Sequence, residues 1–424
     1  MVKSSGLPNI PQEADYVEPE YEDIDKDIVI IGSDPSAVII ANEISSYRSI
    51  DSLLIYDHNP IYEDLNVKID SGVERLDDTS YIGFFEDGHL FVNRHKRKVY
   101  RARINKLIFA TGTRETYPIF ENNDLPGIVS SDLFLRLLEA GCDIRNKRIV
   151  VLGHGWWGRY VASKAIERKG DVTILTSEES VEKTSGYRIV TGVKEVRGEG
   201  YPIIKGLKYS TNDTKGFVEA DLVVSALHRQ PVIEPLLQLK AEPAYTENLD
   251  AVTIYTNING ETSAKNIYMI GEATGTSRED LIREAELLTR FFTGRNSLSE
   301  KERDSLKNIY DRKRIVDFYS KIVTERPRFY LGGDGIDGLK FICLCEDITL
   351  NDVIKTYDMG YETLEKIKRY TALGTGSCQG RWCKYTALML LSYFRKVPLG
   401  SLGLIRQRPP LEPVEIGLLG GEIS

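Results

Sequence analysis

The 424-residue chain lacks the features that mark membrane, secreted and nucleic-acid-binding proteins. No apolar run approaches the roughly 18 residues that a membrane-spanning helix needs, and the N-terminus has no signal-peptide pattern. Acidic residues outnumber basic ones, which gives a net charge of −8, and no basic stripe stands out. We therefore expect a soluble, cytoplasmic protein of two or three domains, with no nucleic-acid partner and no membrane span.

Cysteine and histidine are also scarce, with five residues of each. No histidine stands in a cluster with cysteines or carboxylates, so the sequence offers no histidine metal site and no acid–base pair. Cys142 has no cysteine nearby and is expected to be a small buried residue. The other four cysteines form two tight pairs near the C-terminus, Cys343 with Cys345 and Cys378 with Cys383.

The segment between the two cysteine pairs, Thr349 to Leu373, predicts one or two short helices with a break at Gly360. Such a segment would return one pair to the other and build a site for a thiophilic metal centre. Glycines next to Cys378 would let backbone N–H groups approach sulfur, and a helix beginning near Gln379 would bring its positive end close. Spacing alone leaves three alternatives open: a [2Fe-2S] cluster, a structural zinc, for which Cys-x-Cys is tight, and disulfides or plain thiols.

The N-terminal part of the chain carries a strand, turn, helix and strand in that order. The first strand is the apolar run 28–31, and the second is the run 53–56, which ends at Asp57. The turn after the first strand reads Gly32-Ser33-Asp34-Pro35-Ser36-Ala37. This order is typical of a dinucleotide-binding unit, in which the terminal acid binds a ribose hydroxyl. Asp34 stands where a second glycine is expected and puts a negative charge near the diphosphate, so we predict FAD here, with a degenerate site as the alternative.

A second unit of the same kind begins at Arg148. Its glycine turn is complete, with Gly153, Gly155 and Gly158. Trp156, within the turn, would stack on a ring or pack in the core. Ser177 stands at the acid position, and Glu178 and Glu179 follow it without an arginine nearby. Because two carboxylates would repel a 2′-phosphate, we predict NAD(H) or an ATP-like adenine nucleotide here rather than NADP.

Two further segments return the chain to the first unit. One predicted strand ends in Ala110-Thr111-Gly112, and another ends in Gly271-Glu272. The second resembles a flavoprotein signature in which an aspartate holds the ribityl chain and a helix N-terminus lies behind the pyrophosphate. Glu272 is one methylene longer than that aspartate. The first unit has no Cys-x4-Cys pair, which excludes a standard disulfide reductase.

A family resemblance adds to these patterns. Cys-x-Cys, a helical spacer and Gly-Thr-Gly-x-Cys-Gln-Gly-Arg-x-Cys over 374–383 resemble the bacterioferritin-associated-ferredoxin-like domain. The version in question is fused to the α subunits of dye-linked proline dehydrogenases, opine oxidases, hydrogen cyanide synthase and the sarcosine oxidase group. The tail 408–414 is similar to the end of that domain. The resemblance covers nearly the whole chain from about residue 26, and it implies that the four cysteines ligate a [2Fe-2S] cluster.

The expected fold class is α/β, with two Rossmann-like, glutathione-reductase-like domains and a small, mostly helical C-terminal iron–sulfur domain. The expected division is an acidic flexible arm over 1–25, an FAD-type domain over 26–126 and 255–298, an inserted nucleotide-binding domain over 127–254, a linker helix over 299–336, and the [2Fe-2S] domain and tail over 337–424.

The resemblance implies an electron-transfer, α-type subunit of a hetero-oligomeric, FAD-dependent dehydrogenase or oxidase. Its substrates would be amines or imino acids of the proline, sarcosine, hydroxyproline or opine type. Its partners would be a second, β-type flavoprotein subunit that oxidises the substrate, and an electron acceptor. We assign no catalytic residue to this chain. The alternatives are an NADH-dependent flavin and iron–sulfur reductase, and a scaffold whose nucleotide sites only stabilise the assembly.

Overall fold

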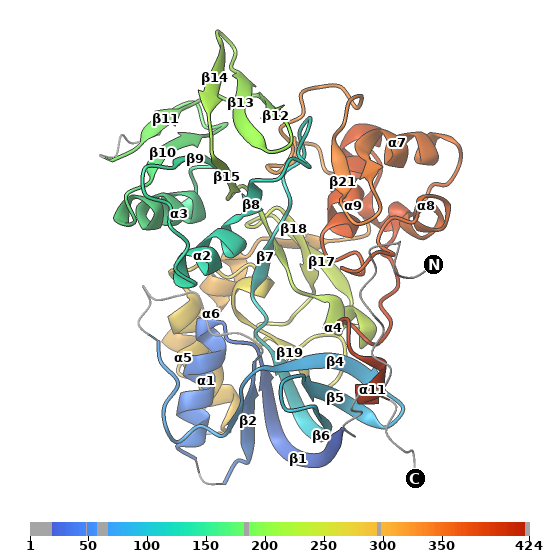
Figure 1. Cartoon of the computed structure of the whole chain (residues 1–424). Coiled ribbons are helices and arrows are strands. Elements are labelled where there is room, and N and C mark those ends of the chain that lie inside the picture. The colour runs from blue at the N-terminus through green and yellow to red at the C-terminus, as the bar shows by residue number, and fades with distance from the viewer. Residues whose placement is uncertain (1–18, 48, 57–66, 182–185, 295–297, 420–424) are drawn as a thin grey trace, which may run out of the picture.

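The computed structural model describes residues 19–47, 49–56, 67–181, 186–294 and 298–419. Figure 1 shows two α/β units stacked one above the other, with a mostly helical C-terminal unit beside the upper one. The last helix returns to the lower unit. The predicted fold class is confirmed. Among the described residues, no helix combines the length and the hydropathy that a membrane span requires.

The lower unit is built on a sheet with the order β3-β2-β1-β6-β5-β4, to which β19 adds beside β6. Its strands are β1 (Glu20–Ile31), β2 (Ser52–Ile55), β3 (Arg75–Leu76), β4 (Thr79–Phe85), β5 (Gly88–Asn93), β6 (Lys98–Phe109) and β19 (Ile267–Met269). Helices α1 (Pro35–Ser45), α5 (Leu281–Phe292) and α6 (Glu300–Arg312) gather on one side of it (Figure 1). Alternate apolar residues of β1 therefore pack either on these helices or on the opposite core.

Strand β1 begins earlier than the sequence predicted. Residues 20–25, which we assigned to a flexible arm, pair in parallel with β6. Their acidic side chains lie against basic ones of β6: Lys98 contacts Glu20 at 2.6 Å, and Arg101 contacts Asp23 at 2.6 Å. The acidic stretch thus has a charged partner strand, which its composition alone did not reveal.

The upper unit contains a parallel sheet with the order β11-β10-β9-β15-β8 and a three-stranded antiparallel sheet above it. The parallel strands are β8 (Ile128–Ser130), β9 (Arg148–Leu152), β10 (Asp171–Leu175), β11 (Arg188–Val190) and β15 (Leu222–Ser225). The antiparallel strands are β12 (Glu195–Gly200), β13 (Ile204–Ser210) and β14 (Lys215–Glu219). Helices α2 (Ser131–Glu139) and α3 (Trp156–Glu167) cover the parallel sheet. Strands β7 (Thr113–Glu115) and β16 (Arg229–Pro231) pair where the chain crosses between the units.

The remaining elements differ from the expected boundaries. Strands β17 (Pro243–Thr246), β18 (Ala251–Ile254) and β20 (Ile315–Asp317) form a separate sheet, so the end of the predicted insert and part of the predicted linker pair with each other. Their buried residues join the core shared by the lower and C-terminal units. The C-terminal elements are β21 (Phe341–Cys343), β22 (Ile348–Thr349), α7 (Leu350–Asp358), α8 (Leu364–Thr371), α9 (Cys383–Arg395), α10 (Leu399–Leu402) and α11 (Ile416–Leu419). Helix α11 packs on the first sheet through Leu418.

Candidate nucleotide and metal sites

The first glycine turn joins β1 to α1 at the carboxyl edge of the first sheet. A Cβ on Gly32 would lie 2.0 Å from the carbonyl oxygen of Ala110, so only glycine lets β1 and β6 end side by side. Asp34 is the N-cap of α1, and its carboxylate accepts a hydrogen bond from the backbone N–H of Ser36 at 2.8 Å. Pro35 occupies the first helical position, where its fixed φ is favourable. The turn has the predicted place in the fold, but the chain caps its own helix there.

The carboxylate of Asp34 also reaches the Gly271-Glu272 signature. The backbone N–H of Glu272 donates to it at 3.4 Å, and the N–H of Gly271 donates to the buried carboxylate of Glu284 at 3.1 Å. Burial, and then the nearby Glu272 carboxylate, raise the pKa of Asp34 to about 7. The N–H groups that a diphosphate would use are thus bound to carboxylates of the chain itself. A diphosphate at this turn would have to compete with the Asp34 carboxylate for these donors.

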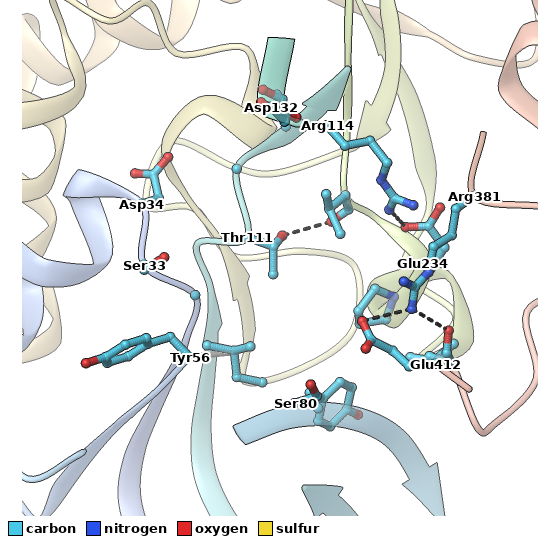
Figure 2. Close-up of a pocket in the computed structure, with 18 of the residues that line it drawn as sticks. Ser33, Asp34, Tyr56, Ser80, Thr111, Arg114, Asp132, Glu234, Arg381 and Glu412 are labelled. Carbon is cyan, nitrogen blue, oxygen red and sulfur yellow. Dashed lines mark hydrogen bonds and ion pairs between the residues drawn. The ribbon is translucent and has the colours of Figure 1, made fainter. Parts of the chain in front are cut away.

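The first turn opens onto a cavity of about 380 Å³ between the lower unit, the upper unit and the C-terminal segment (Figure 2). Five of the predicted residues line it: Gly32, Ser33, Asp34, Thr111 and Gly112. Tyr56, Ser80 and Tyr81 close the end beside β2, where the adenosine of a dinucleotide lies in this type of fold. Ala110, Gly271 and Glu272 lie behind the turn, and the predicted ribose-binding Asp57 lies outside the described residues.

The opposite end of the cavity is rich in arginine, which the sequence analysis missed. Arg229 binds Asp132 at 2.9 Å, and its guanidinium lies 4.2 Å from the ring centroid of Trp157. The other arginine pairs there are Arg114 with Glu234 and Arg381 with Glu412 (Figure 2). These residues come from separate parts of the chain. No local sequence motif could therefore have predicted that they lie at one cavity.

The second glycine turn, between β9 and α3, has the geometry that the first one lacks. A Cβ on Gly158 would lie 2.0 Å from the carbonyl oxygen of Gly153, so the glycine permits the helix to pack on the turn. Gly155 is the N-cap of α3, and no side chain caps the helix there. A Cβ on Gly155 would meet no atom within 4 Å. At the N-terminus of α3, no side chain takes the place that a phosphate would occupy.

The second turn is flanked by aromatic side chains and by the acidic residues that follow β10. Trp156 stacks on Tyr160 with a centroid distance of 4.9 Å, and the guanidinium of Arg278 lies 3.8 Å from the Trp156 ring centroid. Ser177 is exposed at the end of β10, next to two glutamates. Glu179 pairs with Lys194 at 2.7 Å, so one of the two predicted repelling carboxylates is partly neutralised.

The four C-terminal cysteines converge from the end of β21, the loop after it, the loop before α9 and the first residue of α9. The thiol of Cys383 donates a hydrogen bond to the sulfur of Cys343, and the thiol of Cys378 donates one to the sulfur of Cys345. The Cys383 thiol, followed by the N–H groups of Gly374, Glu346 and Cys345, lowers the pKa of Cys343 to about 6. Burial raises the pKa of Cys378. The structure therefore brings all four predicted ligands together.

The cysteines lie as two contacting pairs rather than around one point. In the part of the chain that the structure describes, no three His, Cys, Asp or Glu side chains surround a single ion position. A binuclear iron centre with two thiolates on each iron fits two pairs, whereas one zinc needs a single tetrahedral shell. Backbone N–H groups that already point at sulfur are also typical of iron–sulfur sites.

Two local predictions near cysteines were wrong. Cys142 is exposed, because it lies in the turn that follows α2 rather than in the core. The helix expected from Gln379 begins only at Cys383. Gln379 and Gly380 have positive φ angles of 52° and 74°, which a right-handed helix does not accommodate.

Comparisons with known proteins agree with this architecture. One of the opine oxidase subunits of Agrobacterium tumefaciens (strain Ach5) is 22% identical over 354 residues, which cover 74% of this chain and 69% of that protein. The alpha chain of the sarcosine oxidase of Corynebacterium sp. (strain P-1) is 22% identical over 353 residues, or 79% of this chain and 35% of that protein. This chain spans less than two thirds of most of the curated relatives it matches.

The crystal structure of L-proline dehydrogenase from P. horikoshii has the same fold, with a TM-score of 0.73 and 20% identity over 96% of this chain and 81% of that one. Residues 337–422 match the model of the sarcosine oxidase A3 domain. Residues 40–287, more than half of the chain, match the model of pyridine nucleotide-disulphide oxidoreductases. With both nucleotide-binding folds in place, the chain is an oxidoreductase that belongs to the pyridine nucleotide-disulphide oxidoreductase family.

Proposed function

We propose that the chain is the electron-transfer subunit of a hetero-oligomeric, FAD-dependent enzyme that oxidises an amine or imino acid of the proline, sarcosine, hydroxyproline or opine type. The names of the similar proteins support the substrate class and the subunit role. One observation carries the electron-transfer part. The cavity of the first unit and the cysteine site share a wall, formed by Arg381 and Trp382.

Trp382 connects the two sites directly. Its side chain lines the cavity, and its backbone N–H hydrogen-bonds to the sulfur of Cys378. The next residue is Cys383, which begins α9 and is buried. A redox-active ring at the arginine end of the cavity would thus be separated from the cysteines by one residue. Such an arrangement suits transfer of electrons between two centres better than it suits a lone structural metal.

We assign the cysteine site to a [2Fe-2S] cluster held by Cys343, Cys345, Cys378 and Cys383. Bound there, a cluster of this type takes up and passes on one electron at a time. The chain itself would contribute four thiolates and the N–H groups that point at them. Burial of Cys343 and Cys383 would exclude water from one side of the centre, and the exposed Cys345 would leave the other side open to a partner.

We assign a nucleotide to each of the two glycine turns and expect the first turn to bind its nucleotide more weakly than the second. The open N-terminus of α3 would hold the phosphates of NAD or an ATP-like nucleotide, and Glu178 and Glu179 would disfavour a 2′-phosphate. FAD in the first unit is supported by the fold and by the cavity. We expect it to be held weakly, because the carboxylate of Asp34 occupies the diphosphate donors.

Substrate oxidation is assigned to a second flavoprotein subunit. Three of the arginines that line the cavity, Arg114, Arg229 and Arg381, are each paired with a carboxylate of this chain, and Arg136, also on the cavity wall, is exposed. A second candidate, an NADH-dependent reductase, is favoured by the open turn at Gly155 alone. NADH would then bleach the flavin or the cluster of the purified chain rapidly.

The test uses the full chain, purified alone and with a co-expressed flavoprotein partner. We expect about two irons and two sulfides per chain. We also expect dye reduction with proline, sarcosine, hydroxyproline or an opine only when the partner is present. Cys345→Ser should lose iron, whereas Cys142→Ser, at an exposed thiol outside the site, should retain it. One zinc without iron would contradict the cluster, and substrate turnover by the single chain would contradict the division of roles.

A further inference from the structure

A fully buried lysine lies beside the cysteine site. Lys384 follows Cys383 at the start of α9, and its side chain is only 2% exposed. Its ammonium pairs with the carboxylate of Glu234 at 2.8 Å and donates to the side-chain oxygen of Gln407 at 3.1 Å. Its stem passes close to Gly380, where a Cβ would lie 3.6 Å from the Lys384 Cδ. The lysine stem thus packs against the loop between Cys378 and Cys383, and its ammonium, held by Glu234 and Gln407, interacts electrostatically with the Cys383 thiol.

Glu234 joins this lysine to the cavity. It begins α4 (Glu234–Gln238), its side chain is 7% exposed, and it also pairs with Arg114, which lines the cavity. Burial alone would raise the pKa of Glu234, but Arg114 and Lys384 lower it to about 2. The carboxylate is therefore ionised, and the three side chains carry one net positive charge, with Lys384 and Glu234 buried and Arg114 facing the cavity.

Stability alone does not account for such a group. A buried ion pair generally gains little over apolar residues of the same volume, because both charges lose their hydration. A buried positive charge does have a strong effect on a neighbouring redox centre. The charge on a [2Fe-2S] centre with four thiolates becomes more negative by one unit on reduction, and net charge and hydrogen bonds near the sulfurs set its potential.

We propose that Lys384 is the residue that raises the reduction potential of the cysteine-bound cluster, and that Glu234 and Arg114 position it. This inference rests on the proposed [2Fe-2S] cluster. The step is the addition of one electron, supplied by an external reductant, with no bond made or broken at the protein. The fixed ammonium stabilises the added charge across a medium of low dielectric constant.

The test is a redox titration of the purified full chain with dithionite, followed by the electron paramagnetic resonance signal of the reduced cluster. Lys384→Gln removes the charge but can still hydrogen-bond to Glu234 and Gln407. At the wild-type midpoint potential we expect its ratio of reduced to oxidised cluster to fall about ten-fold, which is a shift of about 59 mV to lower potential for a one-electron couple. Lys366→Gln, at an exposed lysine of α8, removes the same charge from the surface and should leave the potential unchanged.

Lys384→Arg keeps the charge and is expected to keep the wild-type potential. A potential lowered equally in the Arg and Gln variants would overturn the inference, since packing rather than charge would then be responsible. An unchanged potential in Lys384→Gln, with the cluster present, would overturn it as well and leave the proposed function intact. Wild-type protein without iron would overturn both, and iron analysis before the titration separates that outcome from the others.

Discussion

The two glycine turns of this chain occupy equivalent places in two similar units, yet they differ in what fills the helix N-terminus. At α1 the carboxylate of Asp34 accepts from the N–H of Ser36 and from that of Glu272. At α3 the N-cap is Gly155, and no side chain caps the helix. The first turn places its own carboxylate at the helix N-terminus. The second turn places no side chain there, so its N–H groups can bind an external anion such as a phosphate.

This difference shows that the residues that the βαβ fold requires are not the same as those that nucleotide binding requires. Both turns connect a buried parallel strand to a helix, so both satisfy the packing that the βαβ unit requires. Only the second also leaves backbone N–H groups available for phosphate. A side chain that reproduces part of the phosphate's hydrogen bonding keeps the architecture stable while it weakens the site. Three experiments test this comparison, from the largest expected effect to the smallest.

The largest effect is expected at the second turn. Gly158→Val would place a Cβ 2.0 Å from the carbonyl oxygen of Gly153, so α3 must move away from the turn. We expect a loss of about 1–3 kcal/mol in the free energy of unfolding and at least a hundred-fold weaker binding of NAD or ATP. Gly155→Ala meets open space but puts a less favourable residue at the N-cap, so it should cost only about 0.5–1 kcal/mol. Urea unfolding and calorimetric titration with NAD, ATP and NADP measure both quantities, and tight binding to the Val variant would contradict a phosphate site here.

Much of this contrast was visible in the sequence, and part of it was not. The missing glycine at Asp34 and the complete turn at 153–158 predicted one compromised and one intact unit, because glycine spacing acts within a few residues. The side chain of Asp34 could have pointed to solvent. That it folds back to the Glu272 N–H depends on a segment more than two hundred residues away, the helical turn that follows β19. Likewise Arg229 and Arg381 meet at one cavity only through tertiary structure, and no local pattern encodes that.

The next effect is a dependence of stability on pH that comes from the first turn. The pKa of Asp34 is raised from 3.8 to about 7, so the folded protein binds this proton more tightly than the unfolded chain does. Stability is therefore greatest below about pH 4 and falls by about 1.4 kcal/mol per pH unit up to about pH 7 for this group. Glu115, whose pKa burial raises to about 8, acts in the same direction. We therefore compare wild type with Asp34→Asn by urea unfolding at pH 5, 6, 7 and 8. The Asn variant should gain relative stability as pH rises to 7, and a constant difference would contradict the raised pKa.

The smallest effect is expected on nucleotide affinity when the N-cap residues of the two turns are exchanged. Asp34→Gly removes the carboxylate and frees the N–H groups of Ser36 and Glu272 for a diphosphate. Removal of one like charge from a partly screened site should strengthen FAD binding about ten-fold, or by roughly 1 kcal/mol or more. Loss of the cap should cost only a few tenths of a kcal/mol, because glycine is itself a tolerated N-cap. Flavin retained after gel filtration, and calorimetric titration with FAD, measure the gain.

The matched variant is Gly155→Asp, which gives the second turn the residue that the first one has. The space around Gly155 is open and its φ of −54° suits any residue, so the variant should fold. Its new carboxylate can cap α3 as Asp34 caps α1, and we expect NAD or ATP to bind about ten-fold more weakly. If Asp34→Gly gains no FAD affinity while Gly155→Asp loses nucleotide affinity, the first turn has lost its site through more than one residue. If neither variant changes affinity, the carboxylate at the N-cap does not control binding at either turn.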